Sequence, residues 1–152
     1  MAEDFRPPAR THATIVGQMP SATGKVGYDT ASGRRMVALC SATLPWMNVF
    51  DEYRPWSDQD ARARVQIILR QLQEQLRAHC VLILLGRRVA RAFRLPSDAE
   101  WLEWYRTAEH RHPMIAFPHQ SAVNRWWNDE ANVAEARKLA RAVARGRLPL
   151  LK

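Results

Sequence analysis

The chain has 152 residues, 47% of them hydrophobic and 25% charged, a composition typical of a globular protein large enough to bury a core. Its 23 basic residues outnumber 15 acidic residues and give a net charge of +8. No apolar run approaches the roughly 20 residues that span a bilayer, and the first residues lack the apolar core of a signal peptide. We therefore expect a cytoplasmic protein with no membrane partner.

Four short apolar segments predict strands, with a flexible leader over residues 1–12 before the first of them. They are residues 13–16, residues 45–50, Cys80 to Leu85 and Met114 to Pro118. The third is apolar without interruption, as expected for a strand whose two faces are both covered. Glycine-bearing or proline-bearing loops follow the first two, over residues 17–30 and 51–57.

Helical spacing of apolar residues and capping residues predict helices between these strands. They cover residues 31–43, residues 59–79 after a cap at Ser57 or Asp58, a segment from Gly86 to Phe93, residues 96–105, and residues 130–145 after Asn128-Asp129. The alternation predicts an α/β protein with one domain over residues 13–152. Its architecture is expected to be a three-layer α/β/α sandwich around a four-stranded parallel sheet.

Two polar loops follow the first and the fourth predicted strands. They are Gly17-Gln18-Met19-Pro20-Ser21 and the segment from His119 to Arg125. Because ligands of open α/β sheets bind at the carboxyl ends of the strands, we expect these loops to form the two jaws of one pocket.

Metal and cofactor chemistry has little support in the sequence. Cys40 and Cys80 lie far apart and cannot make a zinc or iron–sulfur site by themselves. His110-Arg111-His112 supplies two ligands without an evident third, so we interpret it as a solvated loop. We expect no metal and no cofactor.

The charge pattern leaves two interpretations open. All but three of the basic residues are arginines, which bind phosphate in planar, bidentate geometry and favour a nucleic-acid partner. A solvated surface encoded by a GC-rich genome gives the same composition.

Three motifs give residues 13–145 a resemblance to the uracil-DNA glycosylase superfamily. Gly17-Gln18-Met19-Pro20-Ser21, with Thr23-Gly24 and Ser32-Gly33-Arg34 after it, is similar to the first motif of that family. His119-Gln120-Ser121, with Asn124-Arg125, is similar to its second motif, and Leu84 to Ala90 is similar to its third strand and turn. The family has the α/β sandwich fold predicted above.

The resemblance implies a monofunctional DNA glycosylase that flips a uracil-like or modified base out of DNA and cleaves its N-glycosidic bond. By position, His119 would donate to the base as charge builds on it, and Gln18 would hold the attacking water. Tyr28 would stack on the base and Asn48 would read its amide edge; Gly17, Met19, Pro20 and Ser121 would complete the pocket. Ser21, Arg34 and Asn124 would contact DNA, and Val123 or Arg125 would fill the gap in the duplex. The protein is expected to act as a monomer.

This sequence departs from the family pattern in both motifs. The first motif carries Gln18 and Met19 where Asp, Asn or Glu is common, and the second has Gln120 in place of proline. Gln18 can orient a water but cannot take its proton, and Asp29 or Asp51 could supply a carboxylate from a neighbouring loop. Two alternatives therefore stay open: a catalytically silent protein that binds DNA or a flipped base, and an enzyme acting on free nucleotides.

Overall fold

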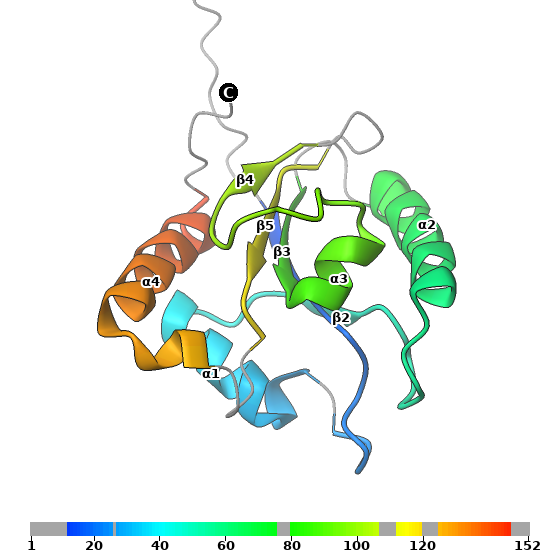
Figure 1. Cartoon of the computed structure of the whole chain (residues 1–152), viewed down its shortest axis with the longest axis horizontal. Coiled ribbons are helices and arrows are strands. Elements are labelled where there is room, and N and C mark those ends of the chain that lie inside the picture. Colours follow the sequence, from blue (N-terminus) through cyan, green and yellow to red (C-terminus); the bar gives the residue numbers. More distant parts are fainter. Residues whose placement is uncertain (1–11, 26, 76–79, 107–111, 120–124, 147–152) are drawn as a thin grey trace, which may run out of the picture.

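The computed structural model describes residues 12–25, 27–75, 80–106, 112–119 and 125–146, which form an α/β fold (Figure 1). Within these ranges five strands form one sheet in the order β2-β1-β3-β5-β4. They are β1 (His12–Gly17), β2 (Trp46–Asn48), β3 (Cys80–Leu85), β4 (Trp104–Tyr105) and β5 (Met114–Phe117). The helices are α1 (Ala31–Cys40), α2 (Asp58–Gln75), α3 (Arg87–Ala92) and α4 (Glu130–Ala144), with short 3-10 helices η1 (Gly27–Asp29) and η2 (Arg125–Asn128).

The four predicted strands pair in parallel, which confirms the parallel core of the expected sheet. Ile15 of β1 lies opposite Trp46 of β2 and Ile83 of β3, and Ile83 lies opposite Ile115 of β5. The apolar strands β1, β3 and β5 are buried because helices cover both faces of the parallel sheet.

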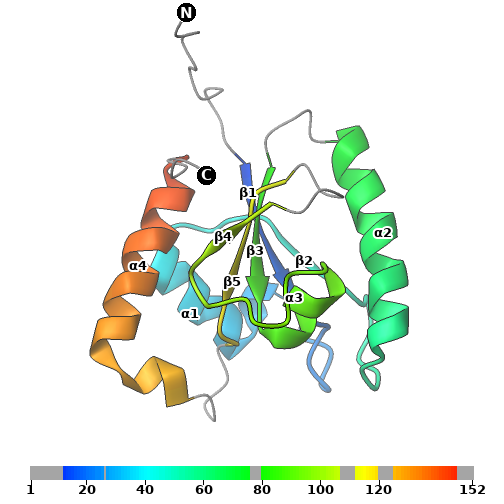
Figure 2. The ribbon, with the colours of Figure 1, turned by 45° about the horizontal axis from the view of Figure 1, so that its top comes forward.

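Alternate residues of the strands build two separate apolar cores, one on each face of the sheet. Leu82 and Leu84 of β3 pack with residues of α2 and α3, whereas Ile83 and Leu85 pack with residues of α1 and α4. Figure 2 shows the same arrangement, with α1 and α4 on one side of the sheet and α2 and α3 on the other. Two helices thus cover each face of the sheet.

The prediction of four strands is wrong by one, and the predicted helix over residues 96–105 is wrong. Ala99 N–H donates to Pro96 O to form a turn, and Leu102 has a φ of 65°, which a right-handed helix does not allow. Trp104 and Tyr105 instead form β4, which pairs antiparallel with β5. Aromatic residues favour strands, and an antiparallel edge strand is common on parallel sheets.

Capping residues explain where the helices begin. Gly33 N–H donates to Thr30 Oγ1 at 3.0 Å, Asp60 N–H to Ser57 Oγ at 3.3 Å, and Ala131 N–H to Asp129 Oδ1 at 2.9 Å. The last two confirm the predicted caps of α2 and α4. The expectation of a solvated His112 is wrong, because this side chain is only 4% exposed.

Helix α1 makes direct backbone contact with η1 at Gly33. A Cβ atom placed on this buried glycine would lie 2.1 Å from Gly27 O and 2.8 Å from Tyr28 Cα. Because these are backbone atoms, they can give way only if the whole loop that carries Tyr28 moves. Gly33 therefore sets how closely the loop after β1 approaches the first helix.

We expect Gly33→Ala to lower the free energy of unfolding by about 1–3 kcal/mol, the usual cost of overpacking. The same change at an exposed helical site raises the free energy of unfolding by about 1 kcal/mol. A decrease for Gly33→Ala therefore indicates the close backbone contact, because helix propensity alone would give an increase. Urea unfolding measures it, with Ser32→Ala in the same helix as the control. Unchanged or increased stability of the Gly33→Ala variant would contradict the close contact.

Candidate functional site

The carboxyl ends of four parallel strands bring the main predicted site residues into one row. Along the sheet the order is Asn48 at the end of β2, Gly17 at the end of β1, Gly86 after β3, and His119 after β5. Neighbouring strands lie about 4.8 Å apart, so side chains from alternate strands can meet across a strand that ends in glycine.

Gln18 and His119 both approach Gly86. A Cβ atom placed on Gly86 would lie 3.4 Å from His119 Cβ and 3.7 Å from Gln18 Nε2. Gly86 also has a φ of 91°, a conformation that favours glycine. Two predicted catalytic side chains, from loops a hundred residues apart in the chain, therefore approach the same point.

The environment of His119 favours its neutral imidazole. Burial lowers the pKa of His119 below its ordinary value of 6.5, and the positive charge of Arg88 lowers it further. A neutral imidazole has one N–H donor and one acceptor nitrogen. The pair of Gln18 and His119 therefore offers uncharged hydrogen-bonding groups that can orient a water or stabilise a developing negative charge.

Asn48 is fixed by two neighbours at the other end of the row. Trp46 Nε1 donates to Asn48 Oδ1 at 3.1 Å, so the amide oxygen is held against the indole. A Cβ atom placed on Gly17 would lie 2.7 Å from the same oxygen, so a side chain at position 17 would displace it. Gly17 thus makes room for Asn48, whose amide nitrogen is a donor for a ligand.

A cavity of about 620 Å³ lies beside Asn48. Three predicted site residues line it, namely Pro20, Tyr28 and Asn48. The other lining residues come from η1, from β2 and its following loop, and from α2: Gly27, Asp29, Trp46, Met47, Asp51, Arg64, Ile68 and Gln71. Gln18 and His119 do not line it, so the cavity and the Gln18–His119 pair are neighbouring parts of one sheet edge, joined through the contact between Gly17 and Asn48.

Tyr28 has a defined position in the wall of this cavity. Its hydroxyl donates to Leu44 O, and its ring packs edge-to-face on Trp46 with the centroids 5.5 Å apart. Burial raises the pKa of the Tyr28 hydroxyl above its ordinary value of 10.0, so the ring is uncharged at neutral pH. A fixed, neutral aromatic ring is suited to packing against a planar ligand.

The two carboxylates that the sequence left unplaced both reach the cavity. Asp29 and Asp51 are among its lining residues. Arg64 holds Asp51 with Nη2 at 3.3 Å from Oδ2, and its Nε donates to Val49 O at 3.1 Å. Carboxylates are therefore available near Asn48, although the first motif contains none.

Other predicted contact residues lie at the rim of this edge. Ser21 Oγ lies 3.1 Å from Thr23 Oγ1 and accepts from Lys25 N–H at 3.1 Å, which closes a turn. Arg34 is exposed and its Nη1 donates to Asp29 O at 3.1 Å, and Arg125 is exposed on η2. Ser121, Val123 and Asn124 lie outside the described residues.

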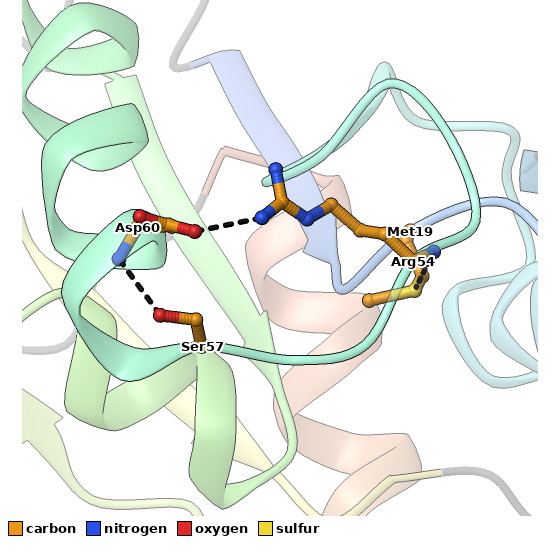
Figure 3. Close-up of polar contacts among 4 residues, drawn as sticks. All are labelled: Met19, Arg54, Ser57 and Asp60. Atoms are coloured by element: carbon orange, nitrogen blue, oxygen red, sulfur yellow. Dashed lines mark hydrogen bonds and ion pairs between the residues drawn. The ribbon is translucent and has the colours of Figure 1, made fainter.

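Met19 has a partner outside the cavity. Its sulfur accepts a hydrogen bond from the backbone N–H of Arg54 at 3.4 Å, as Figure 3 shows. Met19 does not line the cavity beside Asn48. This contact joins the loop after β1 to the loop between β2 and α2.

Trp127 supports His119 in a way that the sequence did not indicate. Its indole Nε1 donates to His119 O at 3.1 Å, and its ring meets Trp126 edge-to-face with centroids 4.7 Å apart. Both tryptophans are half-buried and pack against the core beneath α1 and α4. The adjacent tryptophans in the sequence were the only signal available, and they did not reveal the hydrogen bond.

Comparisons with known proteins do not assign the chain to a family. No protein-family model matches the chain, and no curated protein matches it. Among the described residues, no three His, Cys, Asp or Glu side chains gather into a metal site, and no helix is long and apolar enough to cross a membrane.

We expect His119 to titrate below 6.5 in the folded protein, as measured by NMR of the imidazole protons. Arg88→Gln should raise this pKa only in part, because burial is the larger cause. Arg70→Gln, at an exposed position on α2, is the control and should leave it unchanged.

The same shift predicts a pH dependence of stability. Between the folded and unfolded pKa values of His119 the unfolded chain binds more protons, so the free energy of unfolding rises with pH there and falls as pH drops below 6.5. His119→Gln should remove this part of the dependence. A folded pKa at or above 6.5, or equal shifts in both arginine variants, would contradict the assignment.

Proposed function

We propose that the chain is a monofunctional DNA glycosylase similar to the uracil-DNA glycosylase superfamily, acting as a cytoplasmic monomer. It flips a uracil-like or modified base out of DNA, hydrolyses the N-glycosidic bond and leaves an abasic site. The observation that carries this proposal is the approach of Gln18 and His119 to one point over Gly86, beside the contact between Gly17 and Asn48. No metal or cofactor is needed for this reaction.

The chemistry assigns complementary roles to the two uncharged side chains. Gln18 holds a water whose oxygen bonds to the sugar carbon C1′ as the bond from C1′ to the base nitrogen breaks. The electron pair of that bond leaves with the base, and neutral His119 donates a hydrogen bond to the carbonyl oxygen on which the charge collects. The proton lost by the water ends on the released base, so the atoms and charges balance.

Recognition of the base rests on the cavity side of the row. The fixed amide of Asn48 donates to an exocyclic oxygen of the base, and the ring of Tyr28 stacks on the base plane. Pro20 lines the same cavity, and Gly17 leaves room for the Asn48 amide. Asp29 and Asp51 line the same cavity and are the carboxylates that we propose for activation of a water.

Binding of DNA rests on the net charge of +8 and on exposed basic residues at this edge. Arg34 and Arg125 are exposed there and are proposed to contact phosphates, with Ser21 as a further polar contact. The contacts proposed for Ser121, Val123 and Asn124 remain predictions from the sequence.

One observation favours a second candidate, a silent protein that binds DNA or a flipped base. The first motif carries no carboxylate, and the side chain of Met19 is used to hold Arg54. A protein with this motif can still bind a base in the pocket without cleaving its N-glycosidic bond. Base release separates the two candidates directly.

We expect wild-type protein to release one base from a panel of oligonucleotides and to leave alkali-labile sites. The panel holds uracil, hypoxanthine, xanthine, hydroxymethyluracil and other modified pyrimidines, each in single and double strands. His119→Ala should slow single-turnover release by about 10²–10³-fold, the usual effect of removing such a donor. Gln18→Ala should slow it less, because the water can still enter.

The matched control is Gln66→Ala, an exposed glutamine on α2, which should release the base at the wild-type rate. Absence of release from every substrate, with salt-sensitive binding of DNA retained, would assign the silent binding role. Cleavage of nucleotides alone, without binding of DNA, would assign the chain to enzymes acting on free nucleotides.

A further inference from the structure

The loop between β2 and α2, residues 51–57, presents the most exposed large apolar side chain of the described residues. Tyr53 is 64% exposed, and Ile67 on α2 follows at 43%. Single exposed hydrophobic residues are common on protein surfaces, so exposure alone assigns nothing. What distinguishes Tyr53 is how firmly the loop around it is held.

Arg54, directly after Tyr53, is fixed through both its backbone and its side chain (Figure 3). Its N–H donates to Met19 Sδ at 3.4 Å, and its Nη2 lies 2.7 Å from Asp60 Oδ2. Its guanidinium also stacks over the Phe50 ring, 4.6 Å from the centroid. Three neighbours from three parts of the chain therefore hold this one residue.

The second half of the loop is held in the same way. Trp56 packs edge-to-face on Phe50 with centroids 5.4 Å apart, and its Nε1 donates to Asp58 Oδ1 at 2.8 Å. Ser57 Oγ accepts from Asp60 N–H at 3.3 Å where α2 begins. A loop with this many internal contacts presents Tyr53 at a low cost in conformational entropy on binding.

The loop stands next to the proposed catalytic edge. Phe50 N–H donates to Gln18 O at 3.0 Å, directly before the loop begins. Figure 2 shows this loop beside the one that follows β1, both beyond the carboxyl end of the sheet. A DNA strand that brings a nucleotide to Gln18 and His119 therefore passes within reach of this surface.

The charges of the loop favour contact with a base over contact with a phosphate. Its arginine, Arg54, is paired with Asp60, and the nearby Arg64 and Arg91 are paired with Asp51 and Asp58 at 3.3 and 3.7 Å. Glu52, beside Tyr53, is exposed and repels phosphate. Arg88 also lies near the loop, 5.9 Å from the centroid of the Trp56 ring. At Tyr53 itself, the exposed group that can attract nucleic acid is the aromatic ring.

We infer that Tyr53 is a stacking site for an unpaired nucleobase of the DNA strand, outside the pocket that takes the flipped base. The inference rests on the proposed function for its partner. Stacking of bases on aromatic side chains tolerates every base, since each base has a π face. Tyr53 thereby adds affinity for single-stranded or locally opened DNA without selecting a sequence.

The test is fluorescence anisotropy with a labelled single-stranded oligonucleotide that contains only natural bases other than uracil, so binding is measured apart from base release. We expect Tyr53→Ala to weaken binding by about 5- to 100-fold. Tyr53→Phe keeps the ring and should bind within about twofold of wild type. The matched control is Ile67→Ala, which removes the other exposed apolar side chain and should change nothing.

The dependence of affinity on salt separates stacking from charge. The slope of log affinity against log salt should be the same in wild type and Tyr53→Ala, because no phosphate contact is lost. Wild-type affinity of Tyr53→Ala, an equal loss in Ile67→Ala, or a loss in Tyr53→Phe as large as in Tyr53→Ala would each overturn the inference. Base release by the wild type decides the proposed function independently: a releasing enzyme with no role for Tyr53 refutes only the stacking site.

Discussion

The geometry of the candidate site depends on two strand ends that carry no side chain. A Cβ atom at Gly17 would lie only 2.7 Å from Asn48 Oδ1, and Gly86 has a φ of 91°, a conformation that favours glycine. Both glycines follow strands that are buried on both faces, so the backbone at these points cannot move aside without disturbing the two apolar cores. The core therefore fixes the space at this edge of the sheet, and the polar side chains there, Asn48, Gln18 and His119, belong to or follow three different strands.

The fold was predictable wherever one local pattern dominated. The continuous apolar run of β3 and the helical spacing in α2 and α4 gave these elements with nearly correct bounds, and Asp129 gave the start of α4. The segment of β4 was predicted as a helix because Ser97-Asp98 resembles a helix cap, whereas pairing of Trp104 and Tyr105 with β5 decides its conformation. That pairing is a tertiary contact, which no local pattern contains.

The loops of the candidate site could be predicted from the sequence, but the hydrogen bonds that hold them in place could not. Position after a strand was enough to bring Gln18, Asn48 and His119 to one edge. The contacts that hold this edge depend on tertiary packing and on side-chain rotamers. Trp127 donates to His119 O, Trp46 donates to Asn48 Oδ1, and the N–H of Arg54 donates to Met19 Sδ. Both glycines were visible in the sequence as turn formers, but only the structure shows that a Cβ atom at Gly17 would displace Asn48 Oδ1 and that Gly86 has a φ of 91°.

The structure shows a role for Met19, which stands in the first motif where Asp, Asn or Glu is common in the family. At this position a side chain that accepts a hydrogen bond from Arg54 holds the loop of Tyr53, and the sulfur of methionine does so without bringing a charge into the site. In the proposed reaction the water is then oriented by Gln18, while burial and the charge of Arg88 lower the pKa of His119 and favour its neutral form. A pair of uncharged groups cannot activate a poor nucleophile strongly, so in the proposed reaction most of the barrier must be lowered at the leaving group. A base whose anion is well stabilised, by its own carbonyl groups and by the donors His119 and Asn48, is the substrate that such a site suits.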